Sequence, residues 1–238
     1  EPSIADTFAT ATQPQTCMGL GFVLLSLKFK LIPANTMKKA ILFALLCSLQ
    51  FTTMAGNKIK FYFNHPVDNS VSTGVNAVYL NFCMADTLVN YINRAKYTID
   101  VAVYNFSTGS YASVSTAINN AYSRGVKVRW IFDSSSSNTA LAGLNPLINT
   151  LGSPTTSSYG IMHDKFMIID AYSANPSDAI VWTGATNWGY SQFNTDYNNT
   201  VIFQDSALAH AFTGEFNQMW GGAGIAPVLS NSKFGPKK

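Results

Sequence analysis

The residues best suited to chemistry lie in the segment Ile161 to Asp170, which reads Ile-Met-His-Asp-Lys-Phe-Met-Ile-Ile-Asp. Side chains alternate between the two faces of a β-strand, so His163 and Lys165 are expected on one face and Asp170 on the other. Histidine gains and loses a proton near neutral pH, and a lysine at the mouth of a buried strand needs solvent or an anion as its partner. A phosphate group is the simplest such anion, with Asp170 in a supporting role.

Cleavage of a phosphodiester needs a nucleophile at phosphorus, a proton for the leaving oxygen, and positive charge or donors at the phosphoryl oxygens. His163 can in principle supply the first two, Lys165 the charge and Asn187 a neutral donor. Around His163 the sequence has no cluster of cysteine, histidine or carboxylate residues at metal-ligand spacing. We therefore expect neither a metal nor another cofactor.

The segment from His163 to Asp170 resembles the His-x-Lys-x-x-x-x-Asp signature of the phospholipase D superfamily. Three more segments resemble the family's Gly-Ser-x-Asn motif, a helix-to-strand turn and the closing helix. They are Thr183 to Trp188, Arg124 to Val128, and Phe216 to Trp220. The resemblance extends from about Ile59 to the C-terminus.

This resemblance implies a metal-independent phosphodiester hydrolase that forms a phosphohistidine intermediate. The implied catalytic residues are His163, Lys165, Asp170 and Asn187, and the implied substrate-binding residues are Gly184 and Thr186. Ala185 stands where many relatives have serine, so one hydroxyl near the phosphate is missing and turnover is expected to be weaker. The family's glutamate has no clear equivalent, and Asp196 or Asn198 is nearest. Asp133 is either a supporting residue or a turn residue.

The implied mechanism uses a second histidine, but neither His65 nor His210 has a lysine two positions later. Single-motif members of the family pair two identical chains across a two-fold axis, which predicts a homodimer. Alternatively, residues 221–238 are a linker toward a missing second half, and this chain is an inactive binding module. The substrate is a phospholipid or a nucleic acid, so an endonuclease of the same superfamily remains the alternative enzyme.

The N-terminal residues are expected to lie outside the globular domain. Met37-Lys38-Lys39 and the apolar run Ala40 to Leu49 predict a secretory signal over residues 37–55, and hence a secreted or periplasmic protein. Residues 1–36 are interpreted as a non-native upstream segment. The domain at 56–238 then holds eleven basic and ten acidic residues, and this near-neutral charge slightly favours a lipid over a nucleic acid.

The domain alternates predicted strands and helices, which indicates an α/β fold with a mixed, largely parallel central sheet and helices on both faces. The strands are expected at 59–63, 98–104, 126–132, 161–169, 179–183 and 200–204. The helices are expected at 86–95, 113–123, within 138–151, and after a capping Asp205.

Overall fold

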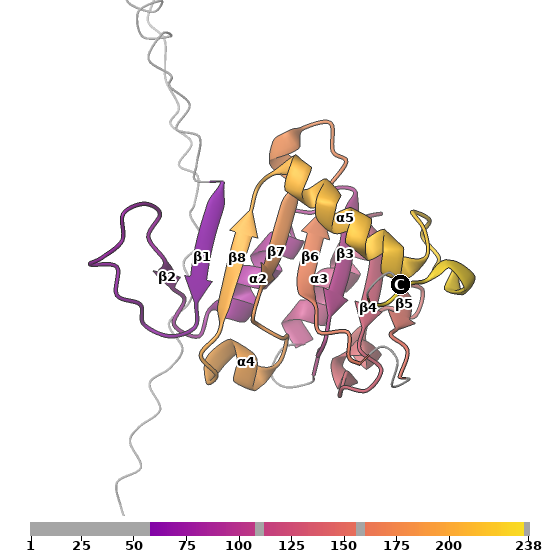
Figure 1. The fold of residues 1–238 in the computed structure, drawn as a ribbon, viewed down its shortest axis with the longest axis horizontal. Helices are drawn as coiled ribbons and strands as arrows, with labels where there is room; N and C mark the ends of the chain where they lie inside the picture. Colours follow the sequence, from indigo (N-terminus) through magenta and orange to yellow (C-terminus); the bar gives the residue numbers. More distant parts are fainter. Residues whose placement is uncertain (1–57, 108–111, 156–159, 236–238) are drawn as a thin grey trace, which may run out of the picture. The chain divides into compact units, whose positions relative to one another are not determined.

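The computed structural model describes residues 58–107, 112–155 and 160–235 (Figure 1). They belong to one compact unit, Ala55–Lys238. The predicted upstream segment at 1–36 and the predicted signal at 37–55 lie outside the described residues. No described helix is long and apolar enough to cross a lipid bilayer.

An eight-stranded sheet forms the centre of the domain, in the order β2-β1-β8-β7-β6-β3-β4-β5. The strands are β1 Ile59–Phe63, β2 Val78–Tyr79, β3 Thr98–Val103, β4 Lys127–Phe132, β5 Asn149–Gly152, β6 Lys165–Ile169, β7 Ile180–Gly184 and β8 Asn199–Phe203. The α-helices are α2 Met84–Ile92, α3 Ala112–Ser123, α4 Tyr190–Asn194 and α5 Ser206–Trp220. Short 3-10 helices are η2 Thr139–Gly143, η3 Pro176–Asp178 and η4 Leu229–Asn231.

The α/β fold with a mixed sheet is confirmed, but the sheet is less parallel than expected. Three neighbouring pairs are parallel and four are antiparallel. The reason is that β6, β7 and β8 follow one another as direct neighbours, without the crossover helix that a parallel pair requires.

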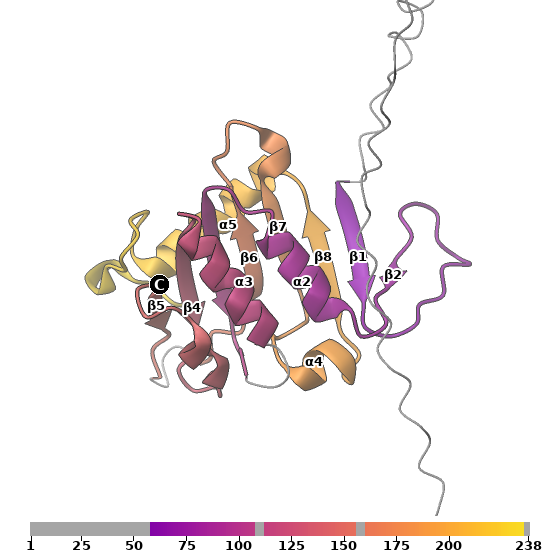
Figure 2. The same cartoon turned by 180° about the vertical axis from the view of Figure 1, so that it is seen from behind.

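Helices cover both faces of the sheet, as predicted (Figures 1 and 2). On one face, α2 and α3 pack Leu88, Ile92 and Ile118 into the larger core. On the other face, α5 places Phe216 and Trp220 in a second core. All five residues of β6 are buried between these layers, which explains their continuous apolar run after Lys165.

Two helix predictions have different outcomes. Helix α5 begins as expected, since the Asp205 side chain accepts a hydrogen bond from the Leu208 amide at 2.9 Å. The helix expected within 138–151 is wrong, because that range holds η2 and β5. Pro146 lacks an amide proton and disfavours helical geometry at Asn145, so the helical turn ends before it.

The segment after α5 packs on the domain as far as residue 235, so this part is not a free linker. Phe234 is buried in the α5 core, and the Lys233 amide donates to the Gln218 carbonyl at 2.9 Å. Arg129 ties the segment to the sheet, since its guanidinium binds the Asp100 carboxylate at 2.6 Å and the Gly224 carbonyl at 3.1 Å. Both charged side chains of this ion pair are buried.

Candidate active site

One edge of the sheet gathers most of the predicted site residues. In the register of β3, β6 and β7, Val103 pairs with Lys165 and Phe166 pairs with Thr183. Tyr104 at the end of β3, Lys165 at the start of β6 and Gly184 at the end of β7 are therefore neighbours. Parallel strand β4 ends at the same edge, where Asp133 follows it.

The structure brings His163 and Lys165 together at this edge. The regular strand begins only at Lys165, so His163 lies in the segment immediately before it. The Lys165 ammonium donates to the His163 carbonyl at 2.8 Å, and Lys165 is only 8% exposed. Burial lowers the pKa of the Lys165 ammonium below its ordinary value, and the nearby Asp164 charge opposes this effect.

Tyr104 contacts both side chains, although sequence analysis did not select it. Its ring meets the His163 imidazole edge-on, with 4.8 Å between ring centroids and an interplanar angle of 62°. The Lys165 ammonium nitrogen lies 5.3 Å from the centre of the same ring. Its position directly after a buried strand is the signal that could have identified it, since loop residues at strand ends commonly carry function.

Asp133 fixes the segment that carries His163. Its carboxylate accepts hydrogen bonds from the Met162 amide at 2.8 Å, the Ser135 amide at 2.9 Å and the Ser153 hydroxyl at 3.2 Å. Burial opposes ionisation, but the hydrogen bond from the Ser135 hydroxyl and the three bonds above together hold the pKa of the Asp133 carboxyl below its ordinary value. Asp133 therefore connects the end of β4 to the residue before His163.

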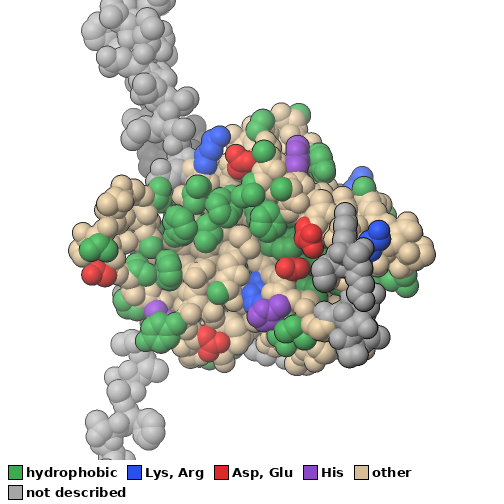
Figure 3. All heavy atoms as spheres, in the orientation of Figure 1, with side chains coloured by type: hydrophobic (Ala, Val, Ile, Leu, Met, Phe, Trp, Pro, Cys, Tyr) green, Lys and Arg blue, Asp and Glu red, His purple; other side chains and the backbone are tan. Residues whose placement is uncertain are grey.

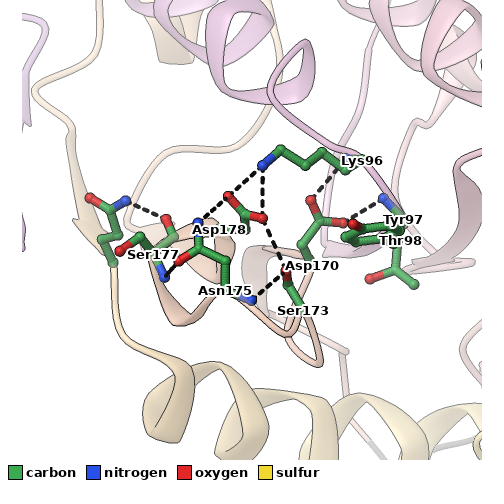
Figure 4. A network of polar contacts seen from close by, with 9 residues as sticks. Lys96, Tyr97, Thr98, Asp170, Ser173, Asn175, Ser177 and Asp178 are labelled. Atoms are coloured by element: carbon green, nitrogen blue, oxygen red, sulfur yellow. Dashed lines mark hydrogen bonds and ion pairs between the residues drawn. The ribbon is translucent and has the colours of Figure 1, made fainter.

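Asp170 lies at the opposite end of β6, roughly 20 Å along an extended chain from His163. Its carboxylate accepts hydrogen bonds from the backbone amides of Lys96, Tyr97 and Thr98, each at 2.8 Å (Figure 4). Its backbone has a φ of 49°, which an aspartate tolerates better than most residues. This geometry anchors β6 to the start of β3, at the end of the sheet away from His163 and Lys165.

The turn after β7 carries the other three predicted residues. Gly184 has a φ of 142°, and a Cβ there would lie 2.5 Å from the Asn199 carbonyl oxygen. The buried Thr186 hydroxyl donates to that carbonyl at 2.7 Å, so its proton is not available to a phosphate. Both residues shape the turn, and the substrate-binding role expected for them stays a prediction.

Asn187 lies in the same turn, and one polar atom of its side chain has no hydrogen-bond partner among the described residues. The adjacent Trp188 amide donates to the Asn105 carbonyl at 2.9 Å, which fixes the turn to the end of β3. The Asn187 side-chain oxygen is buried and makes no hydrogen bond with the described residues. A buried polar atom without a partner is costly, so Asn187 is poised for a ligand or a water molecule.

His163 also lines a pocket of about 210 Å³ beneath α5, together with Asp164, Glu215, Met219 and Phe234. Burial, followed by the Glu215 charge, raises the pKa of the Asp164 carboxyl. On the face of the molecule that carries α5, side chains of histidine, basic residues and acidic residues are all exposed (Figure 3). Neither Asp164 nor Glu215 was selected from the sequence.

The remaining predicted candidates lie elsewhere. His65 stacks on Tyr197 at 3.8 Å between ring centroids, and His210 stacks on Tyr172 at 4.5 Å. Asp196 accepts a hydrogen bond from Gln192, and Asn198 donates one to the Gln192 carbonyl. No group of three or more histidine, cysteine or acidic residues in the described parts of the chain could hold a metal ion.

Comparison with known proteins places this site in a family. A family model described as "Cardiolipin synthase, PLD-like domain" matches residues 88–220, more than half of the chain. A mitochondrial cardiolipin hydrolase from Drosophila melanogaster is 30% identical over 149 residues, covering 56% of this chain and 57% of that protein. A phospholipase D from Rickettsia conorii is 29% identical over 126 residues, covering 52% and 58%.

Solved structures have the same fold. Nuc from Salmonella typhimurium, a phospholipase D family member, has a TM-score of 0.50 and 19% identity, covering 68% of this chain and 93% of that one. NucT from Helicobacter pylori has a TM-score of 0.51 and 21% identity, covering 68% and 94%.

These relatives correct one prediction and assign the family. Similar proteins from three species are named as mitochondrial enzymes, so the predicted secreted or periplasmic location is wrong. The chain spans a little over half the length of the curated relatives it matches. With its family-model match and its shared fold, the chain belongs to the phospholipase D superfamily.

Proposed function

We propose that this protein is a phosphodiester hydrolase that needs no metal ion. The observation that carries the proposal is the His163–Lys165 pair at this end of the sheet, with both side chains in contact with the Tyr104 ring. Lys165 and the side-chain NH2 group of Asn187 donate to the phosphoryl oxygens, and Asp133 holds the His163 segment in place. Asp170 anchors the far end of β6 to the start of β3.

The proposed reaction has two balanced steps. A neutral imidazole nitrogen of one His163 attacks phosphorus, and the bond from phosphorus to the leaving oxygen breaks while a second histidine donates its proton to that oxygen. The second histidine, now neutral, removes a proton from water. The resulting hydroxide cleaves the phosphorus–nitrogen bond, which releases the phosphate monoester and regenerates both imidazoles.

The second histidine comes from another copy of the chain in this proposal. His65 and His210 stack on tyrosines elsewhere, so neither joins His163. On the face that carries α5, Ile59 pairs with Phe203 and Phe61 with Val201, and no described element covers Ile59 or Phe61. Apolar atoms gather on this face over β1 and β8 (Figure 3). We propose this apolar face as the contact surface for a second copy.

A phospholipid is the substrate class that we favour. Asp164 and Glu215 line the pocket beside His163, and their carboxylates repel the successive phosphates of a nucleic acid. The relatives named as cardiolipin hydrolase and phospholipase D agree with a lipid substrate. An endonuclease of the same superfamily is the alternative, and an inactive half that acts as a binding module is the alternative outside enzymes.

The test is hydrolysis of bis(4-nitrophenyl) phosphate by the full chain in excess EDTA. Turnover should persist in the chelator, and His163→Ala should reduce it at least about a thousandfold because it removes the nucleophile. His210→Ala is the matched control, since it removes a histidine that stacks on Tyr172 instead. Turnover that EDTA abolishes and a divalent ion restores would refute the metal-free mechanism.

A further inference from the structure

The ammonium of Lys165 is buried without an ionic partner of its own. Lys165 is 8% exposed, and among the described residues no carboxylate forms an ion pair with it. Its hydrogen bond to the His163 carbonyl satisfies one of three donors. Since an unpaired buried charge is costly, another group must stabilise it.

The aromatic ring of Tyr104 is in position to do so. The ammonium nitrogen lies over the ring at 5.3 Å from its centre, within the range in which the negative face of an aromatic ring attracts a cation. The same ring contacts the His163 imidazole at 4.8 Å. One side chain therefore touches both members of the candidate catalytic pair.

The backbone around Tyr104 is fixed from both sides. Its amide donates to the Asp164 carbonyl at 2.8 Å, which ties it to the residue between His163 and Lys165. Its carbonyl accepts from the Asn138 side chain at 3.3 Å. Asn138 also donates to the Asp133 carbonyl at 2.8 Å and accepts from the Phe106 amide at 2.7 Å. The backbone that carries the ring is thus held by the segments that follow β3 and β4.

We propose that Tyr104 is a positioning residue whose aromatic ring keeps the Lys165 ammonium charged and the His163 imidazole oriented for the reaction. This inference rests on the proposed function. The ring carries the effect and the hydroxyl does not, because both contacts are made to the ring. Tyr104→Phe should therefore keep this positioning function. Tyr104→Leu should lose it, because leucine is apolar but has no π face.

The experiment compares Tyr104→Phe and Tyr104→Leu in the full chain, with Tyr172→Leu as a control for loss of an aromatic side chain at the far end of β6. Binding of inorganic phosphate is measured by calorimetry from pH 6 to 10, and kcat and KM are measured with bis(4-nitrophenyl) phosphate. Tyr104→Leu should bind phosphate about 3- to 30-fold more weakly, as expected for a lost cation–π contact. Its phosphate binding should also disappear at a lower pH, because losing the ring lowers the pKa of Lys165 further.

Tyr104→Leu should also lower kcat, whereas Tyr104→Phe and Tyr172→Leu should stay within about threefold of the unmodified protein, as changes that leave the contacts intact do. Phosphate binding separates this inference from the proposed function. If the unmodified protein binds phosphate without turning over, the same ranking in binding and pH dependence still supports the role of Tyr104. Equal phosphate binding and equal pH dependence in the leucine and phenylalanine variants would overturn it.

Discussion

At the scale of single residues, the site depends on a lysine that burial keeps less basic than usual. The pKa of the Lys165 ammonium is lowered because the side chain is desolvated. Only the charged form attracts a phosphoryl oxygen strongly. Raising the pH through this lowered pKa removes the charge, so substrate binding must weaken on the alkaline side before an ordinary lysine would titrate.

This predicts a KM for bis(4-nitrophenyl) phosphate that rises with pH below the ordinary lysine range, near 10.4. Lys165→Arg is the control, because a guanidinium stays charged at every pH that the protein tolerates. Its KM should be nearly independent of pH over the same interval, even if kcat is lower. A KM with the same alkaline rise in both proteins would assign the titration to another group.

At the scale of elements, two aspartates anchor the central strands, one at each end of these strands. Asp133 connects β4 to the residue before His163, and Asp170 connects β6 to the start of β3. The first anchor is close to the reacting groups and the second is not. Replacing the two should therefore affect activity and stability in different proportions.

Asp170→Ala should act on stability alone. It leaves three backbone amides without their acceptor, which costs about 1–3 kcal/mol and lowers the melting temperature by roughly 3–10 °C. Well below that temperature, kcat per folded molecule should remain within about threefold, since no reacting group has moved. Calorimetry and kinetics on one preparation check both values. A loss of kcat as large as that of His163→Ala would instead show that Asp170 takes part in catalysis.

Asp133→Asn should reduce both stability and turnover, because it weakens the acceptor of the Met162 amide beside His163. Asp178→Asn is the control, since its ion pair with Lys96 at 2.7 Å is largely exposed on the lysine side. That variant should lose at most about 1 kcal/mol of stability and no activity. Unchanged turnover in Asp133→Asn at a temperature where it is folded would contradict the anchoring role.

Most elements and the candidate His163–Lys165 pair were predictable from local patterns, but the contacts between elements were not. The apolar run after Lys165 predicts a strand buried on both faces, and the structure agrees. The turn role of Thr186 depends on the Asn199 carbonyl thirteen residues later, which no local pattern reveals. Tyr104 and Glu215 reach the site from β3 and α5, so only the tertiary fold brings them to His163.

At the scale of the whole molecule, one chain supplies one His-Lys motif, and the proposed reaction needs two. The apolar face over β1 and β8 lies on the same side of the sheet as α5 and the His163 pocket. In the proposed dimer, this face buries Ile59 and Phe61, and the second copy supplies the second motif. A substitution on this face that prevents dimerisation should then also abolish activity.

Phe61→Glu should convert a dimer into a monomer and abolish turnover, because a carboxylate on the apolar face opposes its burial. Val71→Glu is the control, since Val71 is 82% exposed and lies outside the paired strands. Mass in solution and hydrolysis are measured on both variants. A fully active Phe61→Glu monomer would contradict the shared site.

The central claim is that His163 attacks phosphorus, and trapping the covalent intermediate tests it most directly. The protein is mixed with bis(4-nitrophenyl) phosphate, quenched in alkaline denaturant, which preserves phosphohistidine, and digested for mass spectrometry. We predict a 4-nitrophenyl phosphoryl group on His163, absent from His163→Ala and present in His210→Ala. Turnover with the adduct on another residue, or with no adduct under conditions that preserve a phosphohistidine standard, would contradict the account.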